Sequence, residues 1–199
     1  MGAILQSLNR TIIAGFVLLV VIVVLASALS GTWVQFASHG WALFCVRWLH
    51  VMFGVMWIGL LWYFNFVQMP SMPKIPDEQK PAISKVIAPA ALMWFRHAAL
   101  WTVITGVTLA SMNGYIVKAL AFQERGFAPI GIGMWLALIM AFNVWFIIWP
   151  NQQKALGMVP VEADAKAKAA RTAMLTSRLN TMLSIPMLYC MVAQQNGGL

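Results

Sequence analysis

The sequence predicts an all-α membrane protein, a polytopic bundle of five transmembrane helices. Hydrophobic residues make up 61% of the 199 residues and charged residues only 9%, whereas a soluble domain carries about 25% charged residues. Five apolar stretches are each long enough to cross a hydrocarbon core of roughly 30 Å. Helices are expected in all five, because lipid leaves the backbone groups of an isolated strand unsatisfied. We therefore predict a single integral membrane domain, 1–199, with spans at 11–29, 41–67, 88–113, 129–149 and 173–192.

The first stretch, 11–29, follows Arg10 and ends near Ala26-Ser27-Ala28, a pattern that also occurs in signal peptides. Its apolar run is longer than a signal-peptide core of about 7–15 residues, so we predict an uncleaved anchor. Between the second and third stretches, the proline-rich segment from Pro70 to Pro81 is expected to connect the spans without a helix. In the fourth and fifth stretches, five polar residues are expected to hydrogen-bond between helices: Asn143, Arg178, Asn180, Thr181 and Ser184.

Basic residues predict the orientation, because cytoplasmic loops are enriched in Lys and Arg. The formal net charge of +8 comes from 13 Lys+Arg against 5 Asp+Glu. With the N-terminus inside and the C-terminus outside, the outer segments hold only Lys118 and Arg125. The inner segments hold Arg10, Lys74, Lys80, Lys85, Lys154, Lys166, Lys168 and Arg171. This distribution predicts contact with membrane lipids at the inner face of the membrane, and no nucleic-acid partner.

Two pairs of ionisable residues lie inside the apolar stretches, Arg47 with His50 and Arg96 with His97. Such a side chain costs on the order of 2.5–3.5 kcal/mol or more in hydrocarbon, so it is expected to face a partner, a cavity or a cofactor. Counted from the predicted span ends, His50 and His97 lie at similar depth on antiparallel helices. That placement suits two axial ligands of a heme b iron.

Other residues of the predicted heme site surround this histidine pair. Gly54 leaves room for a flat macrocycle one turn from His50, and Trp57 and Trp101 supply aromatic walls. Arg47 is positioned to pair with a propionate. One competing interpretation is that both histidines only hydrogen-bond neighbouring helices and no cofactor is bound. Another is that they face some other ligand.

Two motifs resemble the bacterial membrane-bound urate oxidase (urate hydroxylase) family. The first runs Cys45-Val46-Arg47-Trp48-Leu49-His50-Val51, followed by Trp57-Ile58-Gly59 and Tyr63-Phe64, and the second runs Val86-Ile87-Ala88-Pro89-Ala90, followed by Trp94-Phe95 and Trp101. The resemblance implies a membrane redox domain that oxidises urate and passes electrons to a cytochrome c. The chain departs from that family in having Leu60 and Leu61 after Gly59, and we expect a short form without the C-terminal cytochrome c.

Three functions follow as alternatives. The first is a redox-associated accessory subunit of a larger membrane complex of electron transport, with or without heme b. The second is a truncated urate oxidase that passes electrons to a separate cytochrome c. The third is a purely structural membrane subunit. No catalytic residue is assigned, and the sequence leaves open whether the protein is an enzyme.

Overall fold

The computed structural model describes residues 2–198, and within them every regular element is a helix. The chain divides into two compact units, Met1–Ala42 and Leu43–Leu199, which are described separately. The all-α class is therefore confirmed.

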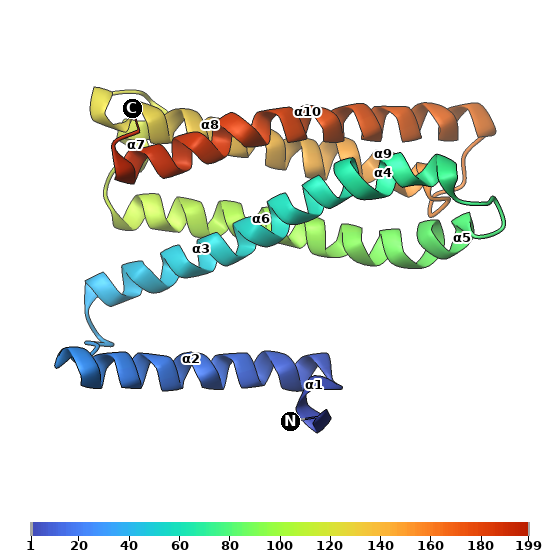
Figure 1. Ribbon diagram of the computed structural model, residues 1–199. Helices are drawn as coiled ribbons and strands as arrows, with labels where there is room; N and C mark the ends of the chain where they lie inside the picture. The colour runs from blue at the N-terminus through green and yellow to red at the C-terminus, as the bar shows by residue number, and fades with distance from the viewer. Residues whose placement is uncertain (1, 199) are drawn as a thin grey trace. The chain divides into compact units, whose positions relative to one another are not determined.

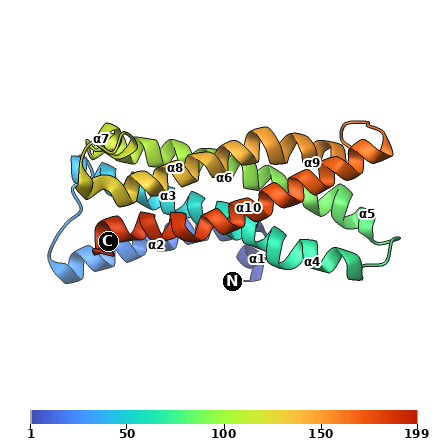
Figure 2. The same ribbon diagram turned by 90° about the horizontal axis from the view of Figure 1, so that it is seen from above.

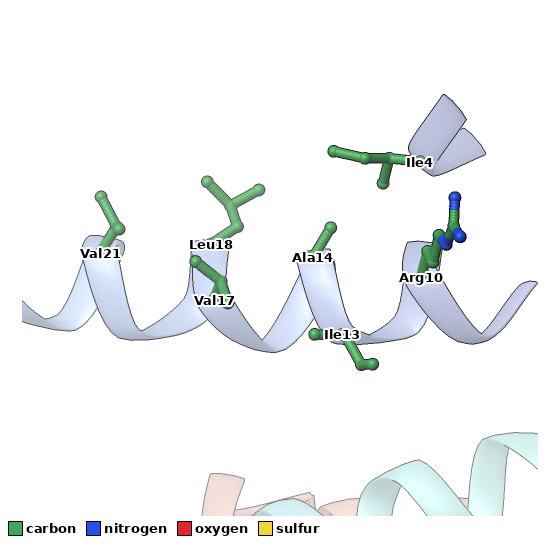
Figure 3. Close-up of a pocket in the computed structure, with 7 residues that line it drawn as sticks. All are labelled: Ile4, Arg10, Ile13, Ala14, Val17, Leu18 and Val21. Carbon is green, nitrogen blue, oxygen red and sulfur yellow. The ribbon is translucent and has the colours of Figure 1, made fainter. Parts of the chain in front are cut away.

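The first unit contains α1 (Gly2–Leu5) and α2 (Leu8–Ser30), and α2 includes the predicted span 11–29. Figure 3 shows a shallow apolar groove along these two helices. The groove is lined by Ile4, Arg10, Ile13, Ala14, Val17, Leu18 and Val21. Apart from Arg10 this lining offers no polar group, so the groove is not a candidate for chemistry.

The second unit is built from four long helices joined by short connections (Figures 1 and 2). In both views α10 runs beside α8 and α9, and it packs against both. The first long helix joins α3 (His39–Trp62), η1 (Tyr63–Gln68), α4 (Met69–Ser71) and η2 (Met72–Lys74). The second joins α5 (Lys80–Ala82), η3 (Ile83–Ile87) and α6 (Ala88–Met112), and α7 (Ile116–Leu120) follows. The third joins η4 (Arg125–Phe127), α8 (Ala128–Phe142), η5 (Asn143–Ile148) and α9 (Trp149–Ala155), and the fourth is α10 (Ala163–Asn196).

Four helical stretches are long and apolar enough to cross a membrane: Leu8–Ser30, His39–Lys74, Lys80–Met112 and Arg125–Ala155. They contain the first four predicted spans except Asn113, so the prediction of a membrane protein with transmembrane helices is supported. The fifth predicted span, 173–192, also lies in a helix, α10. That helix begins with a polar, lysine-containing segment, and it is not among the four.

The core of the second unit lies where α3, η1, α6, α8, η5 and α10 meet. Trp57, Leu61, Phe95 and Met140 are almost completely buried there. Phe64 packs edge-to-face against Phe95, with 5.7 Å between ring centroids. Aromatic pairs of this geometry add stabilisation beyond the area that they bury. This contact joins the first long helix to the second.

Three π-helical segments occur in the described residues, and each ends two residues before a proline. η1 precedes Pro70, η3 precedes Pro89 and η5 precedes Pro150. Proline has no N–H and its ring clashes with the carbonyl four residues earlier. The wider π turn displaces that carbonyl and lets the helix continue. The prediction of a non-helical Pro70-to-Pro81 connection is therefore wrong, because only residues 75–79 lie outside helix in this segment.

Candidate functional site

His50 of α3 is held against α6 by two polar contacts. Its Nδ1 lies 2.9 Å from the carbonyl oxygen of Thr102 and 3.1 Å from Oγ1 of Thr105. Because a carbonyl only accepts, Nδ1 carries the ring proton and Nε2 keeps a lone pair. A Cβ at Gly106 would lie 2.9 Å from Cε1 of His50, so the imidazole occupies the space left by that glycine.

Arg47 lies one turn before His50 on α3 and is half-buried. Its Nε is buried and has no hydrogen-bond partner within the described part of the chain. The charge of Arg47 reaches Tyr115, which follows α6 and stacks on Phe127 with 5.2 Å between centroids. Burial raises the pKa of the Tyr115 phenol above its ordinary 10.0, and Arg47 offsets part of that rise.

Arg96 and His97 of α6 meet two tryptophans of the third long helix. Cζ of Arg96 lies 3.2 Å from the ring centroid of Trp149 and 5.9 Å from that of Trp145. The exposed His97 donates from Nδ1 to the carbonyl of Met93 at 2.8 Å and meets the Trp145 ring edge-on at 6.2 Å. We call Arg96, His97, Trp145 and Trp149 the Arg96 cluster.

The Arg96 cluster contains three buried nitrogen atoms that lack a hydrogen-bond partner in residues 2–198: Nε and Nη1 of Arg96 and Nε1 of Trp145. All three carry N–H groups. The sequence indicated Arg96 and His97 but not the tryptophans. The available signal was the spacing of Trp145 and Trp149, which puts both rings on one face of a helix.

The structure does not bring the two imidazoles together. His50 contacts α6 at residues 102–106, about 12 Å further along that helix than His97 at 1.5 Å per residue. Gly106 follows His97 by about two and a half turns and so lies on the opposite side of α6. Two imidazoles that share one metal need nitrogens about 4 Å apart, twice a bond of roughly 2 Å. The pair therefore does not fit one heme iron in this arrangement.

The prediction that His50 and His97 lie at similar depth in the membrane was based on a wrong helix boundary. It was counted from a third span that begins at residue 88, whereas the helix begins at Lys80 and continues through a π-helical segment. The rotation of each helix about its own axis, which decides the side on which a histidine lies, also cannot be inferred from the ends of the spans. Each histidine separately has the tautomer of a metal ligand, with Nδ1 donating to a carbonyl and Nε2 free to bind. The sequence-based prediction that the protein binds heme b stays a prediction.

The other residues of the predicted heme site are also dispersed. Trp57 is completely buried in the core, and its Nε1 has no partner in the described residues. Trp101 is 46% exposed and stacks on Phe53, with 5.9 Å between centroids. A Cβ at Gly54 would only touch Cγ2 of Thr102 at 4.0 Å. These three residues thus do not line one pocket with His50 and His97.

Hydrogen bonds between helices surround the core, as predicted for Asn143, Asn180 and Ser184. The same prediction is wrong for Thr181, which donates to the carbonyl of Ser177 within α10 at 3.1 Å, and Arg178 is exposed. Asn143 donates from Nδ2 to Oδ1 of Asn180 at 2.8 Å, and Asn180 donates to the carbonyl of Met140 at 2.9 Å. Trp62 donates from Nε1 to Oγ of Ser184 at 3.0 Å. These bonds connect α10 to both α8–η5 and α3.

Comparison with known proteins finds one match, to a family model. Residues 115–197 match the family described as urate oxidase N-terminal. The matched segment includes α7 to α10, and with them Trp145 and Trp149. The motifs at 45–106 that suggested the resemblance lie outside it. No curated protein and no solved structure matches the chain. The predicted resemblance is thus confirmed for part of the chain: residues 115–197 are similar to the urate oxidase N-terminal family.

Proposed function

We propose that this protein is a redox-associated accessory subunit of a larger membrane complex of electron transport. The observation that carries the proposal is the match to the urate oxidase N-terminal family, which extends over the third and fourth long helices of the bundle. The proposed location is the bacterial inner membrane. The proposed topology has five spans, with the N-terminus inside and α10 as the last span. In support, α10 packs along α8 and α9, which belong to the apolar stretch Arg125–Ala155 (Figure 1).

Large exposed side chains support a partner within the membrane. On α6, Trp94 is 57% exposed and Trp101 is 46% exposed, and His97 lies between them on the same side of the helix. An apolar face of this kind is expected in contact with lipid or with another membrane subunit. A polar imidazole within it is better matched by a protein or cofactor partner than by hydrocarbon.

The proposed cofactor, heme b, would be held by one histidine of this chain. His97 suits this role because its Nδ1 is bonded to Met93 and its Nε2 lies on an exposed side chain. His50 has the same tautomer but is packed against Gly106. When bound, heme supplies one-electron redox chemistry. The residues of this chain would orient the imidazole and exclude water with their tryptophans.

A second candidate function is a urate oxidase that uses a separate cytochrome c as electron acceptor. The family description favours it. The buried, unpaired Nε of Arg47 offers a donor to an anionic purine. A third candidate, a purely structural subunit, needs neither a cofactor nor a substrate.

Purification in mild detergent separates these functions. A reduced-minus-oxidised difference spectrum with Soret and α bands would support heme, and reduction of that heme on addition of urate would support the enzyme. A colourless protein that co-purifies with a membrane complex would leave only the structural subunit.

Variants identify the histidine that binds the heme iron. His97→Gln is expected to abolish the Soret and α bands if His97 is that ligand. Bands that are unchanged in both His97→Gln and His50→Gln would contradict ligation by either histidine.

A further inference from the structure

Arg96 carries a charge within an apolar helix, and within residues 2–198 no carboxylate forms an ion pair with it. The acidic residues are Asp77, Glu78, Glu124, Glu162 and Asp164, and all lie outside the four spanning helices. In the described residues, Asp77 pairs with Lys80 and Glu124 pairs with Lys118. A guanidinium cannot lose its proton in a protein. Its counter-charge therefore has to come from outside the described chain.

The contact with Trp149 satisfies only one face of the Arg96 guanidinium. At 3.2 Å from the ring centroid, the cation lies directly against the π-face of the indole. That contact uses no N–H group. Nε and Nη1 of Arg96 keep their hydrogens, as does Nε1 of the neighbouring Trp145, and these three atoms lack an acceptor. The cluster thus combines a fixed positive charge with several unsatisfied donors on adjoining side chains.

We propose that the Arg96 cluster binds an oxyanion, the carboxylate or phosphate group of a small molecule or of a lipid. An oxyanion matches the site in charge, and its several lone pairs match the number of free donors. Trp149 covers one face of the guanidinium, so the anion approaches in the guanidinium plane and can also accept from Trp145. Arginine suits such a group better than lysine, because its donors are held in one plane.

The cluster lies near one end of the third long helix. Trp149 is five residues before Lys154, about 7.5 Å along the helix. The exposed His97 side chain adjoins Arg96 and marks where the cluster reaches the surface of the bundle. The cluster therefore lies towards the basic end of the bundle and beside an exposed side chain, although its three free N–H groups are themselves buried. This inference does not depend on heme or on urate turnover.

The test compares the thermal stability of the full-length protein with and without defined anions. Protein in an uncharged detergent is titrated with inorganic phosphate and with benzoate. Separately, it is placed in phosphatidylcholine vesicles with and without phosphatidylglycerol. We expect an anion-dependent rise in melting temperature. A response to phosphate or benzoate identifies a soluble anion, and a response to phosphatidylglycerol alone identifies a lipid headgroup.

Variants show whether the response belongs to the cluster. Arg96→Gln should abolish it, and the control Arg178→Gln, which removes an exposed arginine of α10, should keep it. If Arg96→Gln fails to fold, Trp145→Phe serves instead, because it keeps an aromatic ring, although a smaller one, and removes the Nε1 donor. It should weaken anion binding by roughly tenfold, the effect of one charge-assisted hydrogen bond. The absence of any response in the wild type, or an equal response in Arg96→Gln or Trp145→Phe, would overturn the proposal.

Discussion

At the scale of single residues, the position of the His50 ring depends on Gly106, because glycine has no side chain to occupy that space. Gly106→Ala would place a Cβ 2.9 Å from Cε1 of an imidazole that is already bonded to Thr102. The ring has to move or the helices have to separate, so we expect a destabilisation of about 1–3 kcal/mol. Unfolding by SDS in mixed micelles measures it.

The matched control for Gly106→Ala is Gly59→Ala. A Cβ at Gly59 has no neighbour within 4 Å. Alanine there should be neutral or stabilise the helix by up to about 1 kcal/mol. If both alanine variants unfold at the same SDS fraction as the wild type, His50 is not held in the way described.

The burial of Tyr115 predicts that the folded protein loses stability at high pH. Burial raises the pKa of its phenol in the folded protein, and Arg47 offsets part of the rise. The neutral form is thus favoured by folding. The resulting stability is present below pH 10.0, the ordinary pKa of the phenol, and is lost as the pH rises through the folded pKa.

Melting temperatures measured across this alkaline range test the prediction. Tyr115→Phe should reduce the decline above pH 10.0, because phenylalanine has no proton to lose. Tyr189→Phe, at an exposed position of α10, serves as the control and should keep the wild-type profile. A decline that is equally steep in Tyr115→Phe and in the wild type would assign it to other groups.

At the scale of helices, the Asn143–Asn180 hydrogen bond joins η5 to α10. Asn180 is completely buried and also donates to the carbonyl of Met140. A double-mutant cycle of Asn143→Ala and Asn180→Ala should give a coupling free energy of about 0.6 kcal/mol and at most about 1.7 kcal/mol. Asn180→Ala alone should destabilise more, because it breaks two hydrogen bonds. A coupling of zero would show that the two amides do not interact.

A second prediction at this scale concerns Pro150, which follows the π-helical segment η5. Pro150→Ala restores an N–H and removes the clash with the carbonyl four residues earlier, so η5 should relax towards an α-helix. Hydrogen exchange of the amides at 143–148 should slow. Pro129→Ala is the control, because Pro129 lies in the first turn of α8, where a missing N–H is no loss. Unchanged exchange in Pro150→Ala would mean that the proline does not cause the π-helix.

At the scale of the whole molecule, the proposed topology has five spans. Single cysteines, introduced after Cys45 and Cys190 are replaced, should be labelled from the cytoplasmic side at Pro76 and Val159 and from the outer side at Gly114 and Asn196. The reason is that each connection lies at the opposite end of a long helix from the next. Labelling of Asn196 and Val159 from the same side would show that α10 does not cross the membrane.

Much of this architecture follows from composition. An excess of apolar residues and a scarcity of charges predict helices in a membrane, because hydrocarbon satisfies no backbone hydrogen bond. The existence of each long helix was predictable for that reason, whereas its ends were not. Pro70, Pro89 and Pro150 would usually end or kink a helix. Here a π-helical segment precedes each proline, and the helix continues through it.

The candidate site shows where sequence reasoning stops. The cost of an ionisable group in lipid singled out His50, His97, Arg47 and Arg96 from the sequence alone. Which side chains each of them meets was decided by the tertiary structure. Helix rotation and crossing put His50 against Gly106, and Arg96 against Trp149, which lies in another long helix. The spacing of residues along one helix defines a shared face, but only packing between helices determines what that face contacts.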